Sequence, residues 1–198
     1  MITSHSHKFI FIHVYKVAGS SMESVLNKYE PRYVYFIKKI YRKLGWNISD
    51  HITAMELRNK INVNIFNNYF KFAFVRNPFD WQVSLFCFAR KNKKHHQHEM
   101  INKMTFDEYI DWRVNNEIHL QKNFVCSENG EVLVDFIGRY ENIQNDFEKI
   151  CKTIGIEKIK LPHTNISNHK PFMDYYNEKT KKMVYDAFGE DFKMFNYE

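Results

Sequence analysis

A lysine, a glycine and two serines lie close together just after an apolar run near the start of the chain. The run KFIFIHV covers residues 8–14, and the sequence YKVAGSS follows it. Lys16 supplies a positive charge, Gly19 lets the backbone approach a ligand closely, and the hydroxyls of Ser20 and Ser21 can donate hydrogen bonds. At the start of a helix, backbone N–H groups and the helix dipole also favour an anion. The segment predicts a phosphate-binding loop, with the alternative that Ser20 and Ser21 serve only as helix N-caps.

The order of the lysine and the glycine distinguishes this loop from the Walker A motif of nucleoside triphosphatases. Walker A has the pattern GxxxxGK[ST], in which the lysine stands directly before the hydroxyl residue that binds Mg²⁺. Here Lys16 precedes Gly19 by three positions. The spacing therefore disfavours a Mg²⁺-dependent nucleoside triphosphatase.

A second candidate anion site follows another apolar run. The segment FAFVRNPFDWQVSLF covers residues 72–86, with Arg76 at the end of the run and Ser84 eight residues later on an expected helix. A guanidinium can bind a phosphate through two parallel hydrogen bonds, each worth about 1.5–3 kcal/mol. Either residue alone is typical of a solvated strand end or a plain helix hydroxyl. Together, and after the first loop, they predict a second phosphate contact.

Both segments lie where an expected strand passes into an expected helix. Apolar runs predict buried strands at residues 8–14, 71–75 and 132–140. A stretch with helical spacing follows each strand; the second runs from about Phe79 to Arg90, and the third carries Ile143, Phe147, Ile150 and Ile154 on one face. Strands that alternate with helices predict an α/β, three-layer fold with a central, mainly parallel sheet flanked by helices.

The rest of the chain carries weaker signals. We expect mostly helix at 33–66, an exposed loop at 91–104, a loop at 161–171, a final helix at 175–188, and core positions for Trp81, Phe86 and Phe88. The length of 198 residues suits one domain over residues 1–198.

Composition limits the partners and the location. The net charge is +6, which favours anionic partners in general without choosing among them. The positive charges are spread along the chain and form no recognised nucleic-acid motif, so a nucleic-acid partner is disfavoured. Three scattered cysteines and the lack of a signal-peptide or transmembrane pattern predict a cytoplasmic protein, with attachment to a membrane surface left open.

The first loop resembles the 5′-phosphosulfate loop of sulfotransferases, above all the carbohydrate (type 2) family, whose members read roughly His-x-Pro-Lys-Thr-Gly-Gly-Thr-Ser. The resemblance implies that the cofactor's 5′-phosphosulfate is bound by Lys16, Val17, Ala18, Gly19, Ser20 and Ser21. Two positions depart from the pattern, because Tyr15 replaces the proline and Ala18 replaces the first glycine. These departures leave open the alternative that the protein is a catalytically weakened relative, which binds nucleotide or glycan without turnover.

Three later segments extend the resemblance over nearly the whole chain. Arg76 and Ser84 match the family's 3′-phosphate segment. GRYENIQNDFEKIC at 138–151 is similar to the family's strand-to-helix junction, which implies that Arg139 and Tyr140 lie near the nucleotide. LPHTNISNHKPFMDYY at 161–176 resembles a late loop that closes over the cofactor, with Ser167 and Lys170 as phosphate contacts. The fold implied by the resemblance is P-loop-like.

The resemblance also implies a reaction. The cofactor is 3′-phosphoadenosine 5′-phosphosulfate (PAPS), the product is adenosine 3′,5′-bisphosphate (PAP), and no metal is required. In such in-line transfer, catalysis consists mainly of positioning and charge stabilisation, and Lys16 is expected to stabilise the leaving group. His51, in ISDHITAMELR, is the expected base, with Glu56 and Asp50 as rivals.

The acceptor implied by the resemblance is a hydroxyl of a carbohydrate, and an acidic glycan would suit the positive charge. The basic run from Lys93 to His98 is typical of a solvated loop. Metal binding by this run is disfavoured, and contact with an acidic glycan is the alternative to test. His13 is interpreted as a partner for buried backbone. A small-molecule kinase is the remaining alternative enzyme, but it would require a metal-binding carboxylate near the phosphates, and this sequence offers none at either strand end. The oligomeric state and the acceptor itself are not encoded in any motif.

Overall fold

The computed structural model describes residues 1–34, 36, 40, 51–162 and 170–197. The chain divides into two compact units. Unit 1 comprises Met1–Val75 and Asn123–Thr164, and unit 2 comprises Arg76–Lys122 and Asn165–Glu198. That residues 1–198 act as one domain stays a prediction.

Unit 1 contains a four-stranded sheet with the order β1-β2-β3-β4. Its strands are β1 (Ile2–Ser4), β2 (Phe9–Ile12), β3 (Phe70–Val75) and β4 (Phe136–Arg139). The neighbours β2, β3 and β4 are parallel, whereas the edge strand β1 is antiparallel to β2. The predicted α/β fold with a mainly parallel sheet is confirmed, and all three predicted strands form, although β4 begins later than expected.

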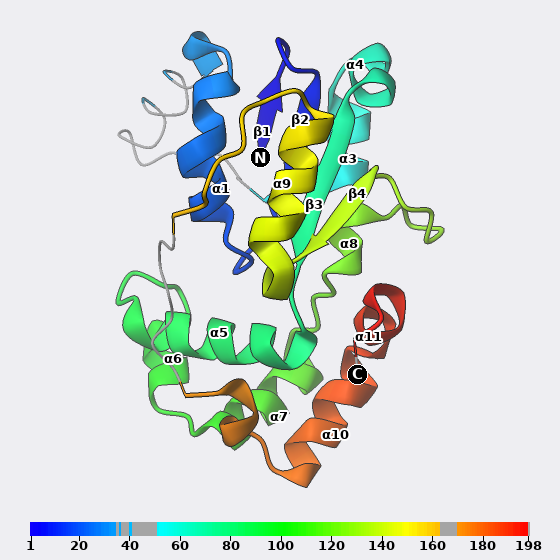
Figure 1. The fold of residues 1–198 in the computed structure, drawn as a ribbon. Helices are drawn as coiled ribbons and strands as arrows, with labels where there is room; N and C mark the ends of the chain where they lie inside the picture. Colours follow the sequence, from blue (N-terminus) through cyan, green and yellow to red (C-terminus); the bar gives the residue numbers. More distant parts are fainter. Residues whose placement is uncertain (35, 37–39, 41–50, 163–169, 198) are drawn as a thin grey trace. The chain divides into compact units, whose positions relative to one another are not determined.

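Phenylalanine side chains fill the centre of this sheet. Phe11 and Phe72 are paired across β2 and β3, with ring centroids 5.4 Å apart, and Phe9 and Phe74 are also buried. A strand buried at every position must be covered on both faces, which is why β2 reads as a continuous apolar run. In Figure 1, α9 crosses in front of the sheet.

The helices of unit 1 follow the strands. They are α1 (Gly19–Leu26), α3 (Ala54–Lys60), α4 (Val63–Asn68), α8 (Lys122–Val125, whose first residue belongs to unit 2) and α9 (Ile143–Thr153), with 3₁₀ turns at Asn27–Tyr29 and Tyr140–Asn142. Phe147 and Ile150 on α9 are buried, as their spacing predicts. The described part of the segment 33–66 contains α3 and α4, in agreement with its helical pattern.

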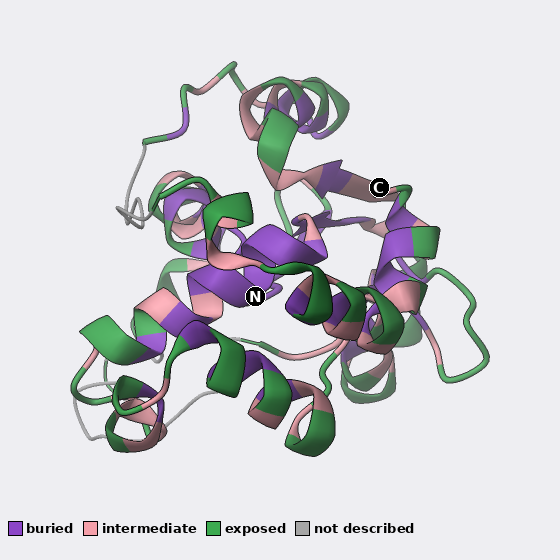
Figure 2. Cartoon of the chain, turned by 90° about the horizontal axis from the view of Figure 1, so that it is seen from below, coloured by how far each residue is buried: buried purple, intermediate pink, exposed green. Residues whose placement is uncertain are grey.

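Unit 2 is helical. It contains α5 (Pro78–Lys91), α6 (His98–Asn102), α7 (Phe106–Asn116), a 3₁₀ turn at Phe172–Tyr175, α10 (Glu178–Ala187) and α11 (Gly189–Phe195). The helix expected after β3 is confirmed as α5, with Pro78 in its first turn. Figure 2 shows the usual division of such helices into buried residues on one side and exposed residues on the other.

Three local predictions are corrected by the structure. The segment 91–104 is not only a loop, because α6 forms within it and buries Ile101 against the rest of unit 2. The expected last helix ends at Ala187, and a second helix, α11, follows it. Phe88 is 39% exposed rather than part of the core, since it lies on the outer side of α5.

Candidate functional site

The carboxyl ends of β2 and β4 lie at the same edge of the unit 1 sheet, because both strands run parallel to β3. Ligands of open α/β sheets bind at this edge. The loop that carries Lys16 follows β2, and Arg139 and Tyr140 stand at the end of β4. The structure thus brings together at one sheet edge two segments that the sequence places more than a hundred residues apart.

The loop after β2 has an unusual backbone. Lys16 and Ala18 both adopt left-handed conformations, with φ of 62° and 52°. This region costs a residue with a side chain about 1–2 kcal/mol, and such strain is concentrated at functional sites. Ala18 stands where the resembling family has glycine, the residue for which this conformation is easy. The departure at Ala18 therefore keeps the loop's shape at an energetic cost.

Ala18 is also the N-cap residue of α1, and it makes no side-chain capping hydrogen bond. Ser20 and Ser21 lie inside the first turn of the helix, so the alternative in which they act only as N-caps is wrong. The first turn contains no acidic residue. An anion placed at this helix start would meet the positive end of the helix dipole, with no carboxylate of that turn opposing it.

Gly19 is required by the side chain packed beside it. A Cβ atom at Gly19 would lie 1.5 Å from Nε2 of His13, a residue that is itself buried. Nδ1 of His13 lies 3.5 Å from Oε1 of Glu23. The imidazole thus faces Gly19 and a carboxylate, and the interpretation of His13 as a partner for buried backbone is not supported.

We expect Gly19→Ala to lower the free energy of unfolding by about 1–3 kcal/mol, the usual cost of overpacking. Chemical denaturation of the wild type and the variant measures the effect. Gly189→Ala is the control, because a Cβ at Gly189 meets no atom within 4 Å. His13→Ala should make Gly19→Ala milder in the double variant, and an equal cost with and without the His13 ring would contradict this explanation.

His51 lies beside the loop. Its Nδ1 is 3.1 Å from the backbone oxygen of His13, and the two rings are 4.4 Å apart between centroids. A carbonyl oxygen only accepts hydrogen bonds, so Nδ1 of His51 must donate, and the neutral ring then carries its lone pair on Nε2. The ring of Tyr15 stands edge-on to His51 at 5.8 Å. The structure thus holds this exposed imidazole in one tautomer next to the candidate phosphate loop.

Glu56 and Asp50 are the rival candidates for the base. Glu56 belongs to a capping box at the start of α3: it accepts a hydrogen bond from the Thr53 N–H at 2.9 Å, and its own N–H donates to the Thr53 hydroxyl. The hydrogen bond from the Thr53 backbone lowers the pKa of the Glu56 carboxyl, which makes it a weaker base. Asp50 lies outside the described residues. The geometry favours His51 over Glu56.

Arg139 is anchored at the end of β4. Its backbone N–H donates to Oδ2 of Asp146 at 3.0 Å, which ties the strand end to the first turns of α9. Asp146 also accepts hydrogen bonds from Asn142 and Lys149. Arg139 and Tyr140 keep their proposed place near the nucleotide as a prediction.

Arg76 and Ser84 belong to unit 2, and both are buried. Arg76 stands just before α5, and its Nε donates to Oδ2 of Asp80 at 2.6 Å. Ser84 lies within α5. Asp80 was not predicted as the ion-pair partner of Arg76, although a carboxylate four residues after an arginine at a helix start favours such a pair.

The remaining predicted contacts are Ser167 and Lys170. Lys170 is exposed just before the 3₁₀ turn that starts at Phe172, whereas Ser167 lies outside the described residues. In the part of the chain with described structure, no cluster of three His, Cys, Asp or Glu side chains could hold a metal ion. Within the same ranges no helix has the length and apolar character needed to cross a membrane.

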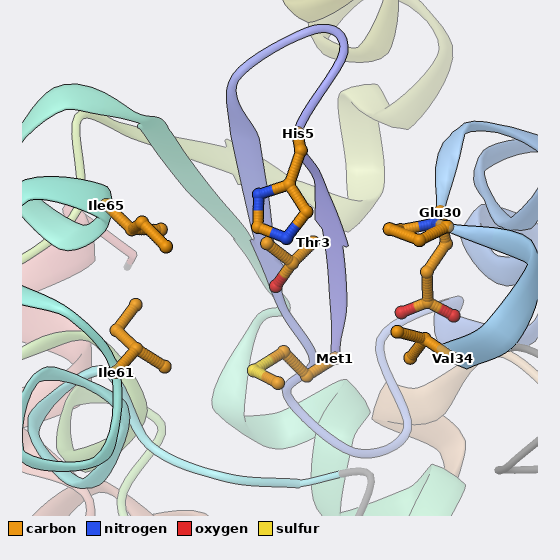
Figure 3. Close-up of a pocket in the computed structure, with 8 residues that line it drawn as sticks. Met1, Thr3, His5, Glu30, Val34, Ile61 and Ile65 are labelled. Carbon is orange, nitrogen blue, oxygen red and sulfur yellow. The ribbon is translucent and has the colours of Figure 1, made fainter.

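Unit 1 also contains a pocket of about 280 Å³, apart from the loop after β2. Figure 3 shows Thr3 of β1 with its flanking residues Met1 and His5 at the centre, Ile61 and Ile65 on one side, and Glu30 and Val34 on the other. Its lining is mostly apolar, and it includes none of the predicted site residues.

The fold is that of a sulfotransferase. It resembles the crystal structure of mouse sulfotransferase SULT7A1 complexed with PAP, with a TM-score of 0.55 and 13% sequence identity over 96% of this chain and 86% of that chain. The chain belongs to the Sulfotransferase family, whose model matches residues 1–198. The family predicted from the spaced motifs is thereby confirmed.

Individual relatives are distant. Carbohydrate sulfotransferase 11 of Rattus norvegicus is 20% identical over 236 residues, which cover 100% of this chain and 66% of the rat protein. Carbohydrate sulfotransferase 9 of Homo sapiens is 24% identical over 168 residues, covering 66% of this chain and 38% of that protein. An uncharacterized protein of Archaeoglobus fulgidus is 30% identical over 105 residues, covering 52% of this chain and 82% of that protein. The chain thus spans less than two thirds of the two carbohydrate sulfotransferases.

Proposed function

We propose that this protein transfers a sulfuryl group from PAPS to a hydroxyl of a carbohydrate, with His51 as the base and without a metal. The observation that carries the proposal is the loop after β2, which contains Lys16, leads into α1, and has the ring of His51 against His13 and Tyr15. A phosphosulfate fits this loop, because the helix start presents N–H groups and no acidic side chain. PAPS, when bound, supplies a sulfuryl group attached to a phosphate leaving group.

Each residue then has a defined task. Lys16 and the N–H groups of the first turn of α1 stabilise the negative charge that develops on the leaving oxygen. His51 accepts the proton of the acceptor hydroxyl on Nε2 while the acceptor oxygen attacks in line, and its Nδ1–H stays on the His13 carbonyl. A positively charged ring is then stabilised by that same hydrogen bond.

The other proposed contacts select the nucleotide. Arg76 and Ser84 bind the 3′-phosphate, Arg139 and Tyr140 lie near the nucleotide, and Ser167 and Lys170 add phosphate contacts. The support for this assignment is the order of the motifs and the family membership. The PAP in the similar mouse structure is consistent with the proposed cofactor.

The proposed glycan acceptor rests on the names of the relatives, among them the carbohydrate sulfotransferases 11 and 9. Transfer of labelled sulfuryl groups to a panel of glycans, lipids and phenols tests it. Labelling of phenols alone would refute the proposal that the acceptor is a glycan. PAP binding without any transfer would favour the alternative that the strained loop at Ala18 supports, a relative that binds nucleotide without turnover.

We expect His51→Ala to lower kcat by about 10²–10⁴-fold, the usual contribution of a general base. The Kd for PAP should stay within about twofold, because the base acts on the acceptor and not on the nucleotide. Steady-state kinetics and calorimetry measure the two quantities. His5→Ala, which removes another exposed histidine of unit 1, is the control. Unchanged turnover in His51→Ala would remove His51 from the mechanism and return attention to Glu56.

A further inference from the structure

A side-chain amide holds the backbone of Arg76 in unit 2. The N–H of Arg76 donates to Oε1 of Gln121 at 2.9 Å, and Nε2 of Gln121 donates to the carbonyl oxygen of Arg76 at 2.8 Å. The chain leaves β3 at Val75, so Gln121 takes over the backbone pairing that a neighbouring strand would otherwise provide. Both hydrogen bonds are buried.

A buried carboxylate holds Gln121 in turn. Oδ2 of Asp191 accepts from the N–H of Gln121 at 2.7 Å, and Oδ1 accepts from the N–H of Lys122 at 2.9 Å. Gln121 and Asp191 are both 0% exposed. Burial raises the pKa of the Asp191 carboxyl to about 6, although the hydrogen bonds from Lys122 and Gln121 act to lower it. A carboxylate so costly to bury is expected to have a structural or functional purpose.

The other end of Arg76 is fixed as well. Its Nε donates to Asp80, a buried residue on α5. The backbone of Arg76 is therefore held by Gln121 and its guanidinium by Asp80, and both partners are buried. A group fixed in this way loses little conformational entropy when it binds an anion, which is the physical basis of preorganised recognition.

We propose that Gln121 and Asp191 are positioning residues that hold Arg76 in place to recognise the 3′-phosphate of the nucleotide. This inference rests on the proposed function, in which Arg76 binds that phosphate. Asp191 orients the backbone of Gln121, and the Gln121 side chain orients the backbone of Arg76. Neither residue needs to touch the nucleotide.

The test compares the Kd of PAP with that of adenosine 5′-monophosphate, which lacks the 3′-phosphate, by calorimetry without Mg²⁺. For Gln121→Leu we expect the Kd of PAP to rise about tenfold while that of the monophosphate stays within about twofold, since misplacement of a binding group by a fraction of an ångström is costly. Gln82→Leu is the matched control, because Gln82 is also 0% exposed in unit 2 and is bonded to the Tyr109 hydroxyl at 3.3 Å. Both of its Kd values should stay within about twofold of the wild type.

Asp191→Asn provides a second variant of the same shape. It should raise the Kd of PAP about threefold relative to the Kd of the monophosphate. In the Gln121→Leu background it should cause no further change, because the two residues act through one chain of contacts. Thermal unfolding of each variant shows that the protein measured is folded.

The possible results separate the inference from the function beneath it. A wild type that binds PAP and the monophosphate equally would overturn the proposed role of Arg76, and the inference with it. A wild type that discriminates, with a Gln121→Leu variant that discriminates equally well, would overturn the inference alone. Equal loss of discrimination in Gln82→Leu would also overturn it, because the effect would then be general destabilisation of unit 2.

Discussion

Replacement of Lys16 by alanine should lower kcat by about 10²–10³-fold, the loss found when one preorganised charge-stabilising group is removed from an active site. The ammonium acts where charge develops on the leaving oxygen, so the Kd of PAP should rise much less, by about tenfold at most. Single-turnover transfer from PAPS and calorimetry with PAP measure the two effects.

The matched control is Lys28→Ala, which removes an exposed lysine from the same unit just after α1 and leaves the loop intact. Its kcat should stay within about twofold of the wild type, as for most surface substitutions. An equal fall in both variants would indicate a general effect of positive charge. A Lys16→Ala variant with full turnover would show that the loop after β2 does not stabilise the leaving group.

Replacement of Arg76 by alanine should weaken PAP binding by about 10²–10⁴-fold, because two charge-assisted hydrogen bonds together contribute about 3–6 kcal/mol. Adenosine 5′-monophosphate should lose less than about threefold, since it has no 3′-phosphate to lose contact with. Calorimetry without Mg²⁺ gives both constants. Equal losses for the two nucleotides would refute the assignment of Arg76.

This variant needs a control for folding, because it leaves Asp80 buried without its cationic partner. The chain offers one in Arg113, which is equally buried at 4% exposure and pairs with Glu117 four residues later. Arg113→Ala should lower the free energy of unfolding of unit 2 with PAP binding kept. Arg76→Lys keeps the charge but loses the planar fork, so it should retain folding and still bind PAP poorly.

Local sequence patterns predicted the strands and helices that form the frame of the fold. β2 and β3 are continuous apolar runs, and α9 repeats apolar residues at helical spacing, so each element could be read from neighbouring residues alone. β1 was not predicted, because a strand of three residues is too short to show the alternation of apolar and polar residues. α6 was not predicted because it is short and lies in a charged segment, and the one buried residue, Ile101, is too few to form a helical pattern.

The motifs also gave the family and the residue types of the candidate site. Lys16, Gly19 and Arg76 stand at recognisable spacings after apolar runs, and the chemistry of phosphate binding follows from their side chains. That part depends on covalent order, which the sequence records directly.

What only the tertiary structure decided are the contacts between residues far apart in the chain. His51 is fixed by the carbonyl of His13, Gln121 holds the backbone of Arg76, and Asp191 lies 70 residues beyond Gln121. Periodicity and spacing report only on neighbours within one helix or strand, whereas these hydrogen bonds form when packing of apolar surfaces brings separate elements together. The sequence by itself thus determined which anion-binding groups are present, and the fold determined which residues hold them in position.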